Sequence, residues 1–168
     1  MMALNLEQTP SRAVFIAAMN ALLRNLELAG GTVHCRNEDP MRCGPELVSA
    51  LEQRYGARKT GLIGLQPSIL KALVHRYGFE AVRVSDLDQD NIGREKRGVT
   101  VWDGETGLDR LIAWCDLGLC TGSTIVNGTI DGIIRRFQEA DKTVVFFGNT
   151  ISGTAQLLSL EHLCPYGR

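Results

Sequence analysis

Hydrophobic and polar positions along the chain follow two periodicities, one typical of strands and one typical of helices. Short apolar runs that read as strands occupy residues 59–64, 81–84, 99–102, 116–120 and 143–147. Segments with apolar residues every three or four positions separate them, at residues 69–77, 107–114 and 124–139, and a last helix is expected from about Gly153. Because strands that alternate with helices form parallel sheets, the pattern predicts an α/β, Rossmann-like fold. We expect a five-stranded, mainly parallel sheet with helices on both faces, and central strands that contain Ile63, Val84, Leu119 and Val145.

The first 56 residues show helical patterns instead. Thr9-Pro10 is a typical helix start, and Gly30-Gly31 is a typical stop. Residues 32–43 form a polar connector, with room for one short strand at 32–35, and Pro45 then opens a helix that reaches Tyr55. We therefore predict an N-terminal helical segment, residues 1–56, that packs on or extends a Rossmann-like domain, residues 57–168.

The joint between the fourth strand and the longest helix is rich in hydroxyl groups, since Thr121, Gly122, Ser123 and Thr124 follow one another. A helix start leaves four backbone N–H groups unpaired, so such a joint can cradle an anion. Thr124, Asn127 and Asp131 are three and four positions apart, which would place them on one edge of the helix. That edge either faces a ligand or is structural, with Ser123 or Thr124 as a helix cap and Asn127 bound to a neighbouring loop.

Ligands of open parallel sheets bind outside the carboxyl ends of the strands, where the strand order reverses. The loops expected there are residues 64–68, 85–93, 121–127 and 148–153. The first turn, residues 61–68, lacks the GxGxxG fingerprint, so NAD is not indicated. Asp86 nevertheless follows Gly64 by 22 residues, about where a Rossmann fold places the acid that binds a ribose hydroxyl. A solvated acidic turn is the alternative reading of Asp86.

The candidate ligand-binding residues come from these loops and from the first helix, in which Asn20 lies on a face of small residues. Asn20 either reaches the site or is an amide satisfied by packing partners. The full candidate set is Asn20, Gly64, Gln66, Asp86, Thr121, Gly122, Ser123, Thr124, Asn127, Gly148, Asn149 and Thr150.

Five cysteines is an odd number without a compact framework, which favours reduced thiols in a cytoplasm. The polar connector leaves Cys35 and Cys43 accessible, so these thiols and His34 are the candidate ligands of a soft metal ion. Against this, no CxxC spacing occurs, and the adjacent His34 and Cys35 would point to opposite faces of an extended strand. Cys115 and Cys120 are equally well explained as small buried apolar residues.

Charge and hydropathy argue against nucleic-acid and membrane partners. The chain carries 18 basic and 19 acidic residues, with a pI near 6.3, so it has no basic stripe for nucleic acid. No apolar run approaches the length of a membrane span, and residues 14–23 lack the cleavage site of a signal peptide. We expect a cytoplasmic protein with no nucleic-acid and no membrane partner.

Three segments resemble a known family. Residues 121–130, TGSTIVNGTI, are similar to a segment of the prokaryotic family named "putative heavy-metal chelation domain", and residues 17–22 and 147–150 resemble two further segments of it. The resemblance implies a Rossmann-like domain whose crevice binds a metal-bearing or ring-containing small molecule, with a link to metallocofactor or corrinoid metabolism. Members of this family often carry an enolase-like N-terminal domain. Fewer than sixty residues precede the sheet in this chain, so the resemblance implies that this domain is truncated to helices. A homodimer would cover the apolar surface that such a truncation leaves.

The leading hypothesis is a protein that binds a small cofactor, either a heavy-metal ion or a metal-containing or ring-containing molecule. One alternative is a transferase-type enzyme whose nucleoside-containing cosubstrate is held by Asp86. The other is a non-catalytic subunit of a larger assembly.

Overall fold

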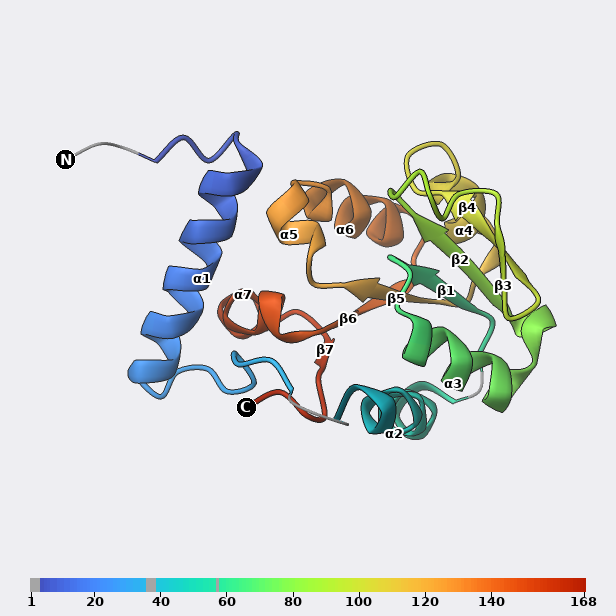
Figure 1. Ribbon diagram of the computed structural model, residues 1–168, viewed down its shortest axis with the longest axis horizontal. Coiled ribbons are helices and arrows are strands. Elements are labelled where there is room, and N and C mark those ends of the chain that lie inside the picture. Colours follow the sequence, from blue (N-terminus) through green and yellow to red (C-terminus); the bar gives the residue numbers. More distant parts are fainter. Residues whose placement is uncertain (1–3, 36–38, 57) are drawn as a thin grey trace.

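The computed structural model describes residues 4–35, 39–56 and 58–168. A twisted sheet runs through the molecule, and helices lie on both sides of it (Figure 1). Its seven strands are β1 (Thr60–Ile63), β2 (Val82–Asp86), β3 (Glu95–Lys96), β4 (Val99–Asp103), β5 (Leu117–Thr121), β6 (Thr143–Phe147) and β7 (His162–Leu163). All neighbouring strands are parallel except β3 and β4, so the α/β prediction is confirmed.

The strand order is β3-β4-β2-β1-β5-β6-β7. Without the antiparallel edge strand β3, this order is the 3-2-1-4-5-6 order of the Rossmann fold. The chain moves outward from β1 in one direction through β2 and β4, and then returns to the other side of β1 to form β5. The order therefore reverses between β1 and β5, and the crevice for a ligand is expected at their carboxyl ends.

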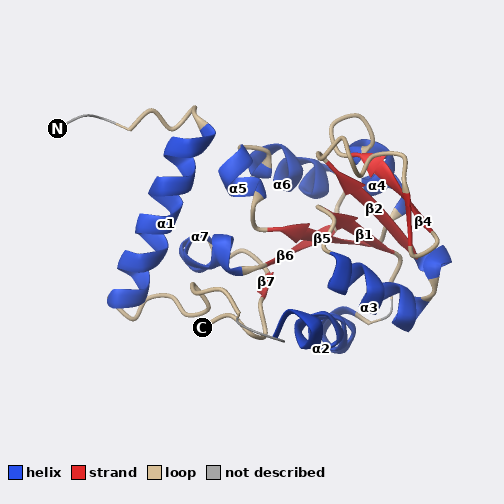
Figure 2. Cartoon of the chain, viewed as in Figure 1, coloured by secondary structure: helices blue, strands red, loops and turns tan. Residues whose placement is uncertain are grey.

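Helices lie on both faces of the sheet (Figure 2), and an apolar core joins them to each face. On one face, α2 (Asp39–Tyr55) and α3 (Pro67–Tyr77) pack on Leu62, Val84 and Leu119, which are fully buried. On the other face lie α4 (Leu108–Trp114), α6 (Ile130–Glu139) and α7 (Ser152–Leu157). As predicted, Ile63, Val84, Leu119 and Val145 lie in interior strands.

The predicted number of five strands was wrong, because β3 and β7 were not expected. Each has only two residues, and both lie at edges of the sheet. So short a segment carries no periodicity, and it is a strand only because its neighbour supplies hydrogen-bond partners. The strand considered at residues 32–35 is absent, and Val33 instead exchanges two backbone hydrogen bonds with Arg168.

The predicted single helix over residues 124–139 was also wrong. The first turn, α5 (Thr124–Asn127), ends at Gly128, whose φ of 82° is left-handed, and α6 begins at Ile130. Asn127 Oδ1 accepts hydrogen bonds from the backbone N–H and the hydroxyl of Thr129, which fixes this break. Thr124, Asn127 and Asp131 therefore do not share one helix edge.

The N-terminal helices differ from the expected bounds. Helix α1 (Thr9–Asn25) ends before Gly30, and α2 begins at Asp39 with Pro45 inside it. Leu47, Val48 and Leu51 of α2 belong to the same core as the sheet, whereas α1 packs beside α5 and α7 at one end of the molecule (Figure 1). The division into segments 1–56 and 57–168 stays a prediction.

Two short 3-10 turns, η1 (Phe79–Ala81) and η2 (Asn149–Ile151), complete the elements. Within the described ranges, no helix combines the length and the apolar character needed to cross a membrane.

Candidate functional site

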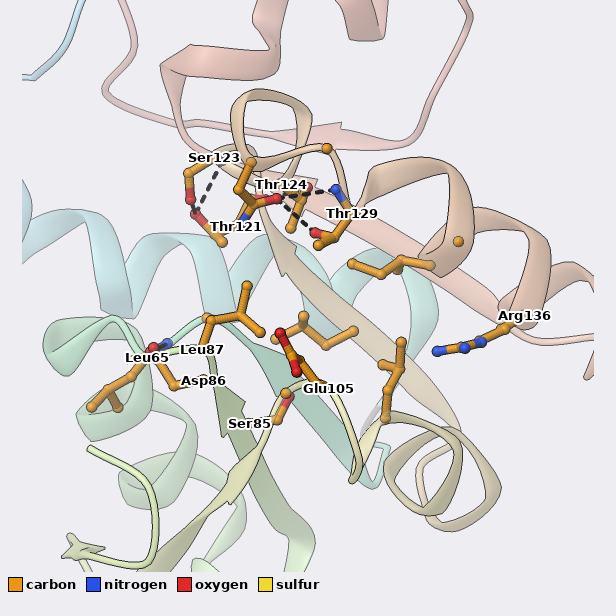
Figure 3. A pocket seen from close by; sticks show the side chains of 18 of the residues that line it. Leu65, Ser85, Asp86, Leu87, Glu105, Thr121, Ser123, Thr124, Thr129 and Arg136 are labelled. Carbon is orange, nitrogen blue, oxygen red and sulfur yellow. Dashed lines mark hydrogen bonds between the residues drawn. The ribbon is translucent and has the colours of Figure 1, made fainter. Parts of the chain in front are cut away.

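A cavity of about 480 Å³ lies at the carboxyl ends of β1, β2, β4 and β5, where the strand order reverses (Figure 3). This volume is in the range of small-molecule sites. We call this cavity the crevice. Its walls come from the loops after these strands and from α6, and they include Gly64, Gln66, Ser85, Asp86, Glu105, Thr121, Ser123, Thr124, Asn127 and Arg136.

The backbone turns sharply at the end of β1. Gly64 has a φ of 86°, and its N–H donates to the Ser85 carbonyl at 2.8 Å. A Cβ on Gly64 would collide with the methyl group of Thr121 at the end of β5. Glycine therefore serves two needs here, a left-handed backbone and a close approach of the β1 turn to β5.

Asp86 lines the crevice (Figure 3), and both of its carboxylate oxygens accept backbone hydrogen bonds. Oδ2 accepts from Leu65 N at 2.6 Å, and Oδ1 accepts from Asp88 N at 2.7 Å. The carboxylate is thus held rigidly beside the β1 turn. Each oxygen keeps one further lone pair with which it can accept a hydrogen bond from a ligand.

The start of α3 offers little to a phosphate. Leu65 N is bound to Asp86, Pro67 has no N–H, and Ile69 N donates at 2.8 Å to Gln66 Oε1, which caps the helix. In nucleotide-binding Rossmann folds the N–H groups at this position bind the pyrophosphate. This use of the amides agrees with the missing GxGxxG fingerprint.

The joint between β5 and α5 also satisfies its own polar groups. Thr124 Oγ1 donates to the Thr121 carbonyl at 2.8 Å, and the hydroxyls of Thr121 and Ser123 are 2.9 Å apart. The amides of Val126 and Asn127 donate to the Ser123 carbonyl. Several polar groups of the joint are therefore used within the chain, and the binding of an anion there stays a prediction.

Ser85 is the exception among these polar groups. Its side chain is 0% exposed, it lines the crevice, and its Oγ has no hydrogen-bond partner among the residues that the structure describes. A buried hydroxyl without a partner costs free energy, so native proteins rarely keep one without a reason. Sequence reasoning did not select Ser85. Its only signal was a polar residue directly after the apolar run 81–84.

Glu105 and Arg136 also line the crevice and were not selected from the sequence. Glu105 follows β4 and points into the cavity beside Ser85, whereas Arg136 points toward the cavity from α6 (Figure 3). Arg136 Nε lies 3.4 Å from the exposed carboxylate of Asp109. Carboxylates thus gather on the β2 and β4 side, and a guanidinium lies on the α6 side.

The remaining candidates from the sequence lie outside the crevice. Gly122, Gly148, Asn149 and Thr150 line a smaller cavity of about 230 Å³, which shares Gln66 and Thr121 with the crevice. Asn20 lines a groove beside α1. Its Nδ2 donates to the carbonyls of Asn149 and Thr150, at 3.3 and 2.9 Å.

The smaller cavity brings Cys35 and Cys43 of the N-terminal segment together with Cys164 near the other end of the chain. His34 also lines it. We call it the thiol pocket. Burial, followed by the charges that Cys164 and Cys35 would carry, raises the pKa of Cys43 to about 11. Across the described ranges 4–35, 39–56 and 58–168, no three His, Cys, Asp or Glu residues are arranged to hold a metal ion. Cys164 was considered only as one of five cysteines, because nothing in its spacing linked it to the connector.

His162 fixes the loop that contains Gly148, since its Nε2 lies 2.9 Å from the Gly148 carbonyl. Burial lowers the pKa of His162 below its ordinary value of 6.5, so the unfolded chain takes up the proton first as the pH falls. The stability that neutral His162 contributes is complete above about pH 6.5 and is lost below it.

We expect the melting temperature of His162→Gln to fall less than that of the wild type between about pH 7 and about pH 5. His75→Gln, an exposed histidine on α3, is the control and should follow the wild type. Identical profiles for all three proteins would contradict this role of His162.

Comparison with known proteins shows which family this chain resembles. A model of the family described as "Putative heavy-metal chelation" matches residues 47–159, which is more than half of the chain. The chain belongs to this family. The resemblance of residues 121–130 is thereby confirmed.

A solved structure from the same family, a protein of unknown function from Pyrococcus horikoshii, is similar to this chain. The identity is 26% and the TM-score 0.44, over 56% of this chain and 35% of that chain, so the match spans about a third of that protein's length. No curated protein matches the chain. Within this member of the family, the strands that end at the crevice lie inside the matched residues, whereas Cys35, Cys43 and Cys164 lie outside them.

Proposed function

We propose that this protein binds a small, ring-containing organic molecule in the crevice at the carboxyl ends of β1, β2, β4 and β5. The observation that carries the proposal is the Ser85 hydroxyl, which is buried at the crevice and has no partner in the described part of the chain. Because Ser85 is 0% exposed, a ligand can bond to this hydroxyl only when the side chains that cover it move, and that bond would recover the free energy that the burial costs.

The side chains around Ser85 indicate the polarity of the ligand. Asp86 and Glu105 accept hydrogen bonds, so the end of the molecule near β2 and β4 would carry N–H or O–H donors. Arg136 would meet a carbonyl or carboxylate at the other end, and Leu65, Leu87 and Ile133 would contact an apolar or aromatic centre. A phosphate is disfavoured by the two carboxylates and by the amides already used at the start of α3.

Ser85→Ala tests this proposal because it separates binding from folding. We expect the variant to be as stable as the wild type or slightly more stable, since a buried hydroxyl without a partner is removed. Its affinity for the compound that co-purifies with the wild type should fall about 5-fold to 150-fold, the effect of losing a hydrogen bond of about 1–3 kcal/mol. Mass spectrometry of denatured protein identifies the compound, and calorimetry with melting curves measures both quantities.

Asn127→Ala is the matched comparison on the opposite wall of the crevice. Because Asn127 Oδ1 holds Thr129, this variant should lose about 1 kcal/mol of stability. A Ser85→Ala protein that is destabilised and binds normally would show that the hydroxyl is structural. A reduced affinity of Asn127→Ala without loss of stability would instead place the ligand against Asn127.

A transferase that uses a nucleoside-containing cosubstrate is a second candidate, and the position of Asp86 favours it. Asp86 ends β2 next to the β1 turn, in a sheet with the Rossmann strand order. Adenosine should then bind and AMP should bind less well, because Leu65 N and Ile69 N already donate to side chains and are not free for phosphate. Equal failure of both in equilibrium dialysis would remove this candidate.

We also propose that the protein is a cytoplasmic homodimer that pairs through α1. Val14 and Leu22 of this helix are 61% and 58% exposed, and neighbouring apolar residues are exposed with them. The only charged residues of α1, Arg12 and Arg24, bond back to the chain through carbonyls such as those of Val126 and Arg168. A helix with an exposed apolar face and few charges is typical of an element that another surface covers.

Light scattering should show a dimer, and Leu22→Glu should produce a folded monomer. A wild-type monomer at high concentration would contradict the dimer.

A further inference from the structure

The thiol pocket gathers residues from three separate segments of the chain. Cys35 ends the described part of the connector after α1, Cys43 lies in α2, and Cys164 follows β7. All three thiols are free and partly buried, and His34 lines the same cavity. Cys35 Sγ lies 3.6 Å from His34 Nδ1. Packing of an ordinary core does not need three thiols and an imidazole around one cavity of about 230 Å³.

The other two cysteines cannot do the same chemistry. Cys115 and Cys120 are the only cysteines among the family-matched residues 47–159, and both are 0% exposed in the apolar core under α4 and α6. Neither of them lines the thiol pocket, so neither can share an ion with Cys43 and Cys164. If this chain holds a heavy metal through sulfur, the ligands must come from the segments outside the family match.

We propose that Cys43 and Cys164 bind a soft, thiophilic cation of the Cu⁺ class in the thiol pocket. Soft cations prefer thiolate ligands and accept two of them, whereas structural zinc requires four converging ligands. The described residues offer no converged set of three or more, so the proposed site has only the two thiols, which is enough for a soft ion of low coordination number. On binding, each of the two thiols releases its proton to solvent as the sulfur–metal bond forms, and no electron is transferred.

The pocket is placed so that a bound ion would lie close to the crevice. Gln66 and Thr121 line both cavities, so they form the wall between them. The ion does not depend on the organic ligand, because Ser85 and Asp86 line only the crevice. The two proposals can therefore fail separately.

The experiment titrates the reduced protein with Cu⁺ under nitrogen, against a chromogenic Cu⁺ chelator as competitor. We expect about one ion per chain for the wild type, and loss of that ion in the Cys43→Ser/Cys164→Ser variant. Cys115→Ala is the matched control, because it removes a thiol outside the pocket, and it should bind Cu⁺ as the wild type does. Ser85→Ala should also bind Cu⁺ normally, even if it fails to bind the organic molecule.

A second measurement keeps the test decisive if the double variant folds poorly. Alkylation of the wild-type thiols, mapped by mass spectrometry, should be slowed at Cys43 and Cys164 by Cu⁺ and unchanged at Cys115. Unchanged Cu⁺ stoichiometry in a folded double variant, or equal alkylation with and without Cu⁺, would overturn the proposal. Tighter binding of Zn²⁺ than of Cu⁺ by the same thiols would overturn the class of metal assigned.

Discussion

Gly64→Ala should lower the free energy of unfolding by about 3 kcal/mol, more than most single substitutions. Two costs combine at this position. An alanine with a φ of 86° adopts a backbone conformation that L residues avoid, which costs about 1–3 kcal/mol. Its Cβ would also collide with the methyl group of Thr121, and that overpacking adds a cost of similar size. Denaturant unfolding of the purified variant measures the sum.

Two further variants separate these costs. Gly78 also has a positive φ, of 80°, with a ψ of 156°, but a Cβ there meets nothing within 4 Å, so Gly78→Ala should show the backbone cost alone, about 1–3 kcal/mol. Adding Thr121→Ser to Gly64→Ala removes the colliding methyl group and should restore part of the lost stability. If the double variant were no more stable than Gly64→Ala, the close approach of β1 and β5 would not be the cause.

The strands around the crevice could be predicted because each is a short segment rich in apolar residues, even though β2 contains Arg83 and β4 contains Thr100. Leu62, Val84 and Leu119 are buried between two layers of helices, which selects apolar residues at nearly every position of a parallel strand. The crevice followed from the same pattern, because the carboxyl ends of parallel strands meet at one edge. Gly64, Asp86 and Thr121 were therefore expected at the crevice, and they line it.

The parts that could not be predicted depend on contacts between distant segments. Cys164 lines the same cavity as Cys43 only because β7 adds to the edge of the sheet, and a two-residue strand has no periodicity to show this. Arg136 reaches the crevice because the helix restarts at Ile130 after the left-handed Gly128. An apolar period continues through residues 124–139, so periodicity alone favours one unbroken helix.

The role of Asn20 could not be decided from the sequence. On a face of small residues, an asparagine can serve a ligand or hold two backbones together, and periodicity does not distinguish these roles. In the structure its Oδ1 accepts from Gly153 N at 2.9 Å, while its Nδ2 donates to two carbonyls of the loop after β6. The side chain therefore joins α1 to the start of α7.

Asn20→Ala should accordingly destabilise the fold by about 2–3 kcal/mol, because it leaves a buried N–H and two carbonyls without their partner. The side chain is 6% exposed, so water cannot easily replace it. Asn25→Ala makes the same chemical change at the exposed end of the same helix, and its effect on unfolding should stay within about 0.5 kcal/mol. If α1 also pairs two chains, loosening it should weaken the dimer, so unfolding is followed at several protein concentrations. Similar stabilities for the two variants would mean that Asn20 does not hold α1 in place, and a loss of ligand affinity in a fully stable Asn20→Ala protein would return this residue to the binding site.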